Sequence, residues 1–148
     1  MVRIEGEIII GRPVEVVFDY AANPGNEPQY NPHMLRAEKI TPGPVAKGTR
    51  FRSAVASMGR TAEMLIECTG YRRPELFATT ITMSQADFIY ALRFQPTVGG
   101  TRMSWSGQVH PKGAFKLLGP VIAWMGTRQE ERIWTSMKRH LEATVAPS

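Results

Sequence analysis

The feature that most constrains this chain is its last third, residues 113–143, which reads GAFKLLGPVIAWMGTRQEERIWTSMKRHLEA. Pro120 suits the first position of a helix, with Gly119 as a tolerable cap. We therefore expect a short turn over 114–118 and a helix from about 120 to 143, roughly 36 Å long at 1.5 Å per residue. Its apolar residues form a face that rotates around the helix axis, so a large curved surface from the rest of the chain is needed to cover it. These residues are Leu118, Val121, Ile122, Met125, Ile133, Met137 and Leu141.

Bulk properties indicate one globular domain, residues 1–148, which is large enough to bury a core. The single cysteine, Cys68, excludes an internal disulfide, and we expect it to be a small buried residue. No apolar run has the length of a membrane span, and the N-terminus lacks signal-peptide architecture, so a cytoplasmic protein is expected. The net charge of +5 comes from scattered basic residues, so nucleic acid is not the expected partner.

The N-terminal segment has the pattern of one strand followed by two short helices. Residues 3–10 alternate, with Ile4, Ile8 and Ile10 on one face, which predicts a half-buried strand. Pro13 opens a helix over 13–22, which residues 23–26 break. A second short helix or turn is expected over 25–30, just before Tyr30 and Asn31.

Strand patterns then follow almost without interruption. Turn signals at Met58-Gly59 and at 98–100 predict hairpins. Strands joined by short turns form an antiparallel meander, and each has one apolar face. The fold class is therefore α+β, a seven-stranded antiparallel sheet around the long C-terminal helix, with a cavity between the two as the default site. After the strand at 3–10, the six further strands are expected over 34–40, 49–57, 60–69, 76–83, 87–95 and 101–110.

Three stretches carry a resemblance that covers nearly the whole chain: IEGEIIIGRPVEVVFDYAANPGNEPQYNP, RFQPTVGGTRMSWSGQV and the C-terminal helix. The chain resembles the START/Bet v 1-like (SRPBCC) superfamily, and within it the polyketide cyclase/dehydrase-like proteins. The resemblance implies the helix-grip fold, a curved sheet wrapped around the long helix. It implies no activity, since members include lipid carriers, hormone-binding proteins, cyclases, chaperone activators and ribosome-associated factors, and the family supplies no catalytic motif to transfer.

Catalytic signatures are absent: the sequence has no nucleophile elbow, zinc-protease motif, phosphate loop or dinucleotide fingerprint. His33, His110 and His140 are dispersed in the sequence, and of the three only His110 sits at a strand end with access to a cavity mouth. We therefore expect neither a metal nor a cofactor.

Ligand-binding candidates are the inward-facing residues of the strands, a lining rich in aromatic residues and methionine that suits a flexible or aromatic ligand. Plain core packing is the alternative for most of them. Polar exceptions are Tyr90 in an apolar strand, Tyr30 and Asn31 near the expected entrance, and Gln129 where the helical face drifts. The full set is Tyr30, Asn31, Phe51, Ser53, Met64, Ile66, Thr79, Phe88, Tyr90, Leu92, Met103, Trp105, Met125 and Gln129.

Three functions remain open. The preferred one is a carrier or sensor that binds a small hydrophobic ligand, a lipid, polyketide or aromatic compound. The alternative is a polyketide cyclase/dehydratase-type enzyme, with Tyr90 or Tyr30 as proton donor and Arg128 stabilising an enolate. In the third, a basic face of Arg12, Arg36, Lys39, Arg72 and Arg73 binds a ribosome or chaperone. Partial exposure of Trp124 and Trp134 on the long helix would provide a dimer face, so both a monomer and a homodimer are compatible with the sequence.

Overall fold

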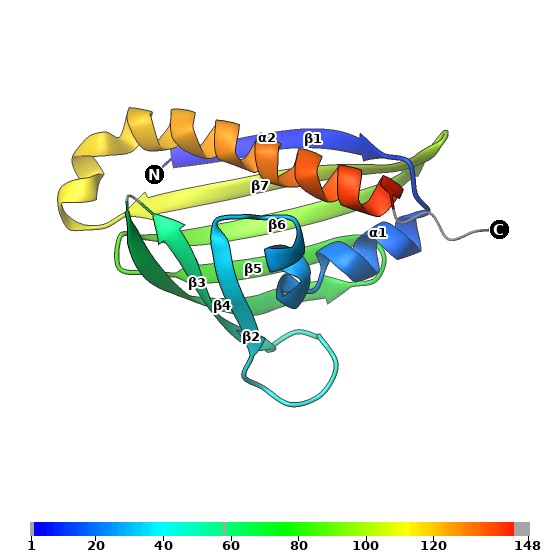
Figure 1. Ribbon diagram of the computed structural model, residues 1–148, viewed down its shortest axis with the longest axis horizontal. Helices are drawn as coiled ribbons and strands as arrows, with labels where there is room; N and C mark the ends of the chain where they lie inside the picture. The colour runs from blue at the N-terminus through cyan, green and yellow to red at the C-terminus, as the bar shows by residue number, and fades with distance from the viewer. Residues whose placement is uncertain (1, 58, 144–148) are drawn as a thin grey trace.

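The computed structural model describes residues 2–57 and 59–143, so Met58 of the expected Met58-Gly59 turn lies outside the described residues. The elements follow the predicted order of strand, two short helices, six strands and a long helix (Figure 1). They are β1 (Val2–Ile10), α1 (Val14–Ala21), η1 (Pro24–Gln29), β2 (Met34–Lys39), β3 (Arg50–Ser57), β4 (Arg60–Arg72), β5 (Leu76–Thr82), β6 (Ala86–Thr97), β7 (Gly100–Pro111), η2 (Gly113–Leu118) and α2 (Gly119–Ala143).

The strands form one seven-stranded antiparallel sheet in the order β1-β7-β6-β5-β4-β3-β2, so the predicted meander and helix-grip fold are confirmed. The sheet curves, and α2 lies across its concave side along β1 and β7 (Figure 1). β4 runs beyond the predicted end at 69 because its pairing with β5 continues past a bulge between Cys68 and Gly70. Cys68 is buried and free, as expected.

Alternation along each strand turns one set of side chains toward α2, and the core forms there. On β6 the inward residues are Phe88, Tyr90, Leu92 and Phe94, and Leu92 pairs with Trp105 on β7. Glycine allows close approach at two points. A Cβ on Gly6 would lie 2.4 Å from the Trp105 ring, and a Cβ on Gly126 would lie 2.5 Å from Ile4 Cδ1, so α2 packs directly on β1.

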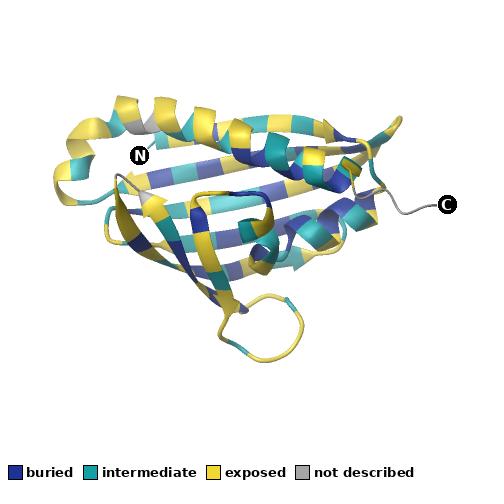
Figure 2. Cartoon of the chain, in the orientation of Figure 1, coloured by how far each residue is buried: buried dark blue, intermediate teal, exposed yellow. Residues whose placement is uncertain are grey.

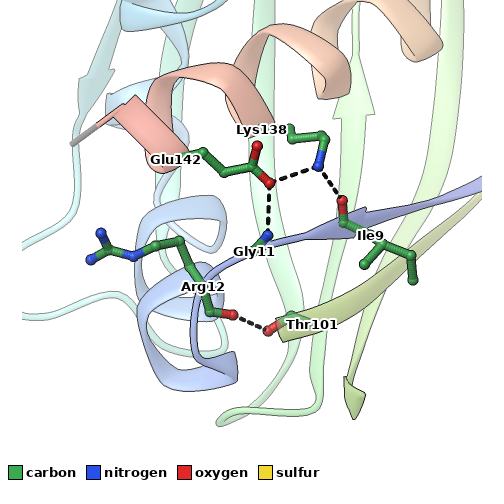
Figure 3. Close-up of polar contacts among 6 residues, drawn as sticks. All are labelled: Ile9, Gly11, Arg12, Thr101, Lys138 and Glu142. Atoms are coloured by element: carbon green, nitrogen blue, oxygen red, sulfur yellow. Dashed lines mark hydrogen bonds and ion pairs between the residues drawn. The ribbon is translucent and has the colours of Figure 1, made fainter. Parts of the chain in front are cut away.

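The C-terminal half of α2 is held to the end of β1 by polar contacts (Figure 3). Glu142 Oε2 accepts hydrogen bonds from the Gly11 amide at 2.8 Å and from Lys138 Nζ at 2.6 Å. Lys138 Nζ also donates to the Ile9 carbonyl at 2.8 Å. Below these contacts, Ile133, Trp134, Met137 and Leu141 are buried in the core. Side chains three or four residues apart on one helical face therefore anchor this half.

The N-terminal half of α2 is different, since its surface is largely exposed (Figure 2). Leu118, Val121 and Met125 are 44%, 50% and 53% exposed, so the expectation that they extend the buried face is wrong. This half still meets β1 at Gly119, beside Val2, and at Gly126, beside Ile4, so these three side chains lie off the face that contacts the sheet. The Ile122 side chain lies outside the described residues. The expectation of two partly exposed tryptophans is correct for Trp124, at 62%, and wrong for Trp134, at 5%.

No helix in the described part of the chain is both long enough and apolar enough to cross a membrane.

Candidate functional site

A hydrogen-bonded cluster of three side chains lies between the sheet and α2. Tyr90 Oη, from the middle of β6, donates to Glu130 Oε2 on α2 at 2.5 Å. One turn further along α2, Trp134 Nε1 donates to the same carboxylate oxygen at 2.7 Å and lies 3.1 Å from Tyr90 Oη. The spacing of four between Glu130 and Trp134 places both on one helical face, so α2 presents a carboxyl and its donor together.

A second carboxyl enters from η1, where Glu27 Oε2 accepts a hydrogen bond from Asn31 Nδ2 at 2.8 Å. Tyr30 follows the last residue of η1, and its ring centroid is 6.0 Å from that of Trp134. Asn31 and Tyr30 are buried, at 3% and 4% exposure, because the η1 turn folds against β2. The two segments bring Glu27 and Glu130 close enough that the charge of Glu130 raises the pKa of Glu27.

Loss of hydration dominates the titration of this cluster. Burial raises the pKa of Glu27 from 4.5 to about 7, against the hydrogen bond from Asn31, which lowers it. Burial also raises the pKa of Glu130, while the hydrogen bonds from Tyr90 and Trp134 favour its ionised form. The Tyr30 and Tyr90 pKa values rise well above the ordinary 10.0, so both phenols stay protonated at neutral pH.

Aromatic rings surround these polar groups. Trp134 lies between Trp105 and Tyr30, with centroid separations of 6.3 and 6.0 Å. Tyr20 continues the row at 5.8 Å from Tyr30, and His140 stacks on Tyr20 at 5.4 Å. Such contacts fix the rings in place, and they form a wall that is apolar on its faces and polar at the indole and phenol edges.

The predicted residues fall into two groups. Most of the fourteen face the concave side of the sheet: nine are buried and three, Met64, Phe88 and Tyr90, are half-buried. Gln129 and Met125 are exposed on α2, and Arg128, proposed for enolate binding, is exposed with its guanidinium 5.0 Å from the Trp124 ring centroid. The nine are Tyr30, Asn31, Phe51, Ser53, Ile66, Thr79, Leu92, Met103 and Trp105.

Sequence reasoning missed Glu27, Glu130 and the inward position of Trp134. A signal for Glu130 existed, because it precedes Ile133, Trp134 and Met137 by three, four and seven residues, the spacing of one helical face. Its setting in the charged run RQEER made it look like a surface residue. Glu27 lies in a proline- and glycine-rich turn, and no periodicity marks its side chain as inward-facing.

Other expected features lie away from this cluster. His110 is exposed on β7, on the face opposite the concave one, so it does not reach a cavity mouth. Among residues 2–57 and 59–143, no group of three or more histidine, cysteine or acidic side chains could hold a metal. Three arginines of the basic face considered for a ribosome or chaperone form ion pairs with carboxylates: Arg36 with Glu63, Arg72 with Glu75 and Arg73 with Asp19. These acidic partners reduce the positive charge of that surface.

Two depressions open on the outside of the molecule, and neither contains a residue of the polar cluster. One, of about 440 Å³, lies over β1 and β7 beside Arg93. The other, of about 400 Å³, runs along the outer side of α2 between Arg128 and Arg139.

Gly107 sets the position of Tyr90, because a Cβ at residue 107 would lie 2.9 Å from Tyr90 Cδ2. We expect Gly107→Ala to displace the ring from Glu130 and to lower stability by about 1–3 kcal/mol, as overpacking does. The indole N–H resonance of Trp134 should shift, because its hydrogen bonds to Tyr90 and Glu130 change.

Gly70→Ala is the matched control, since its Cβ would lie 3.2 Å from Ala78 Cβ, in the β4–β5 pair. It should leave that resonance in place. An unshifted Trp134 signal in Gly107→Ala would contradict this account of how Tyr90 is positioned.

Comparison with known proteins supports the fold directly. The structure of TTHA0849 from Thermus thermophilus matches with a TM-score of 0.84 at 16% identity, covering 97% of this chain and 99% of that one. A START superfamily protein from Mycobacterium smegmatis also matches at 0.84, with 12% identity over 97% and 99% of the two chains. The protein Ara h 8.0201 matches at 0.77, with 17% identity over 96% and 98%.

A search of functionally curated proteins gave no match. The family described as "Polyketide cyclase / dehydrase and lipid transport" matches residues 1–142, nearly the whole chain. At these low identities the structural neighbours establish the START/Bet v 1-like fold, and the family match adds the sequence relationship. The chain is therefore a member of the polyketide cyclase/dehydrase and lipid transport family of the START/Bet v 1-like superfamily.

Proposed function

We propose that this protein binds a small hydrophobic ligand between the concave face of the sheet and α2, as a carrier or sensor. The polar cluster of Tyr90, Glu130 and Trp134 carries the proposal. A core that served only to stabilise the fold would gain nothing from a carboxyl group at its centre, since burial of an ionisable group costs free energy unless the group is paired. A ligand that needs orientation explains why the cluster is placed there.

Two further observations support a ligand at this place. Glu27, Tyr90 and Glu130 are only half-buried, although desolvation dominates their pKa shifts, which is expected of groups that line an interior space. Ser53, inward-facing on β3, is 0% exposed, and its Oγ has no hydrogen-bond partner among the described residues. Buried hydroxyls nearly always have a partner, which a ligand or a water molecule would provide.

A group of exposed apolar side chains on the segment that leads into α2 supports ligand entry from this end. Leu117, Leu118, Val121, Trp124 and Met125 are all at least 44% exposed on η2 and the first turns of α2. Lys138 and Glu142 hold the other half of α2 to the end of β1. The less buried half is therefore the one that would move to admit a ligand.

The test uses the neutral dye N-phenyl-1-naphthylamine, whose absorption overlaps indole emission. In a Trp124→Phe variant the two remaining tryptophans, Trp105 and Trp134, lie 6.3 Å apart at the cluster. We expect saturable energy transfer from these indoles to the dye. Native mass spectrometry of protein purified from its own host would then identify a copurifying compound. Absence of both saturable transfer and a bound compound would refute ligand binding.

Acid–base chemistry on a carbonyl compound is the second candidate, and the observation that favours it is the Glu27 pKa of about 7. A group that titrates near neutral pH can both accept and donate a proton. The candidate groups are then Glu27 and Tyr90 in place of the exposed Arg128. A poly-β-ketone thioester should cyclise to a different product distribution with the protein than without it, and Glu27→Gln should abolish the difference. An unchanged distribution would exclude this candidate.

A further inference from the structure

The polar groups of the proposed ligand site are dominated by hydrogen-bond acceptors. The donors Tyr90, Trp134 and Asn31 bond to Oε2 of Glu130 or Glu27. Among the described residues, no donor is bonded to Oε1 of either carboxyl, and neither Oε1 is among the fully enclosed atoms without a partner. Both Oε1 atoms therefore reach accessible space, where a ligand that carries donors can bond to them.

Positive charge lies outside this region. The arginines of α2, Arg128, Arg132 and Arg139, are exposed, and Lys138 is bound to Glu142 and the Ile9 carbonyl. None of the influences on the pKa of Glu27 or Glu130 comes from a cationic side chain. The basic ring of His140 stacks on Tyr20, whose own ring centroid lies 5.8 Å from that of Tyr30. Although the net charge is +5, the interior of the site is acidic.

The aromatic wall suits a cation as well. Tyr30, Trp134 and Trp105 form one continuous row beside the two carboxyls. Aromatic faces attract organic cations through their quadrupole, and this attraction is larger where water is excluded. A carboxylate ligand such as a fatty acid would meet the charge of Glu130 without a compensating cation, which is unfavourable at a desolvated site.

We propose that the ligand is an amphipathic amine, whose ammonium group is held by Glu27 and Glu130 against Tyr30 and Trp134 while its apolar body lies along the concave sheet. This inference rests on the proposed function, because it specifies the class of ligand for the same site. An ammonium has three donors and no acceptor, so it matches the two unbonded Oε1 atoms. An alcohol has one donor and satisfies only one of them.

The experiment compares three compounds with the same chain and different head groups: decylamine, decanol and decanoate. Each is titrated against bound N-phenyl-1-naphthylamine at about pH 7.5 and below its micelle concentration. We expect decylamine to displace the dye at a concentration at least about tenfold lower than decanol, and decanoate to require more than decanol. Equal or tighter binding of decanol or decanoate would overturn the amine assignment while leaving ligand binding intact. A protein that fails to bind the dye would instead overturn the proposed function.

Site variants test whether Glu27 and Glu130 are responsible for the preference for decylamine over decanol. Glu130→Gln and Glu27→Gln keep the shape and one acceptor oxygen of each side chain, and each should reduce the preference for decylamine over decanol by about tenfold or more. Circular dichroism and urea unfolding report that each variant is folded. Glu131→Gln, one residue along α2 and exposed, is the matched control and should keep the full preference. A preference unchanged in both site variants would place the amine elsewhere and overturn the proposal.

Discussion

Raising the pH from about 4.5 to about 8 is expected to remove about 3 kcal/mol of unfolding free energy through Glu27 alone. The Glu27 pKa is about 7 in the folded protein and near 4.5 in the unfolded chain. Between these values the folded state holds a proton that the unfolded state releases, so stability declines as the pH rises and levels off above about 7. The raised pKa of Glu130 acts in the same direction. Asp19 and Glu142 have lowered pKa values, and their contributions are lost only in acid, below the ordinary values of 3.8 and 4.5.

Glu27→Gln isolates this effect, because the neutral amide keeps an oxygen that can accept from Asn31 Nδ2. The variant should match the original protein near pH 4.5 and exceed it by up to about 3 kcal/mol near pH 8. Urea unfolding at a series of pH values measures this difference directly. The exposed Glu131→Gln provides the control and should run parallel to the original profile. A parallel profile for Glu27→Gln would mean that Glu27 is hydrated in solution.

Gly100→Ala is expected to lower the free energy of unfolding by at least about 3 kcal/mol, which corresponds to a fall of roughly 6–12 °C in Tm for a domain of this size. Gly100 opens β7 at φ +155°, a region that side chains rarely adopt, and its Cβ would lie 2.1 Å from the Ile10 carbonyl oxygen. Backbone atoms must then move, and the adjacent contact of Thr101 Oγ1 with the Arg12 carbonyl, 2.8 Å in length, should be lost (Figure 3).

Gly99→Ala distinguishes the clash of a Cβ at residue 100 with the Ile10 carbonyl from the cost of the backbone conformation itself. Gly99 precedes Gly100 in the same turn with φ +84°, yet apart from its chain neighbours no atom of the described residues lies within 4 Å of its Cβ position. This variant should lose only about 1–2 kcal/mol, the cost of a left-handed conformation in a residue with a side chain. Thermal and urea unfolding of the pair measure the difference. Equal losses in both variants would show that conformation alone, and not the contact with Ile10, makes Gly100 necessary.

The sequence alone was sufficient for the elements of the fold. Alternation predicted which strand residues face inward, as in β6 with Tyr90 and Leu92, and Pro120 with Gly119 predicted the start of α2 to within a residue. These features depend on periods of about two and 3.6 residues and on local backbone preferences, all of which are written within a few consecutive residues. The same patterns identified Tyr30, Asn31 and Tyr90 as polar groups of interest.

Only the tertiary structure decided what surrounds those groups. Glu27 and Glu130 are 103 positions apart and lie in polar stretches of sequence, and they share a site because η1 folds against β2 while α2 packs on β1. Likewise, burial of an apolar residue of α2 depends on the residues of other segments that lie against it. Trp134 is covered, with Tyr30 and Trp105 beside it, while Trp124 is exposed. Helical spacing gives the direction of a side chain around the axis. The atoms that it meets there come from distant segments, and they determine both its hydration and its pKa.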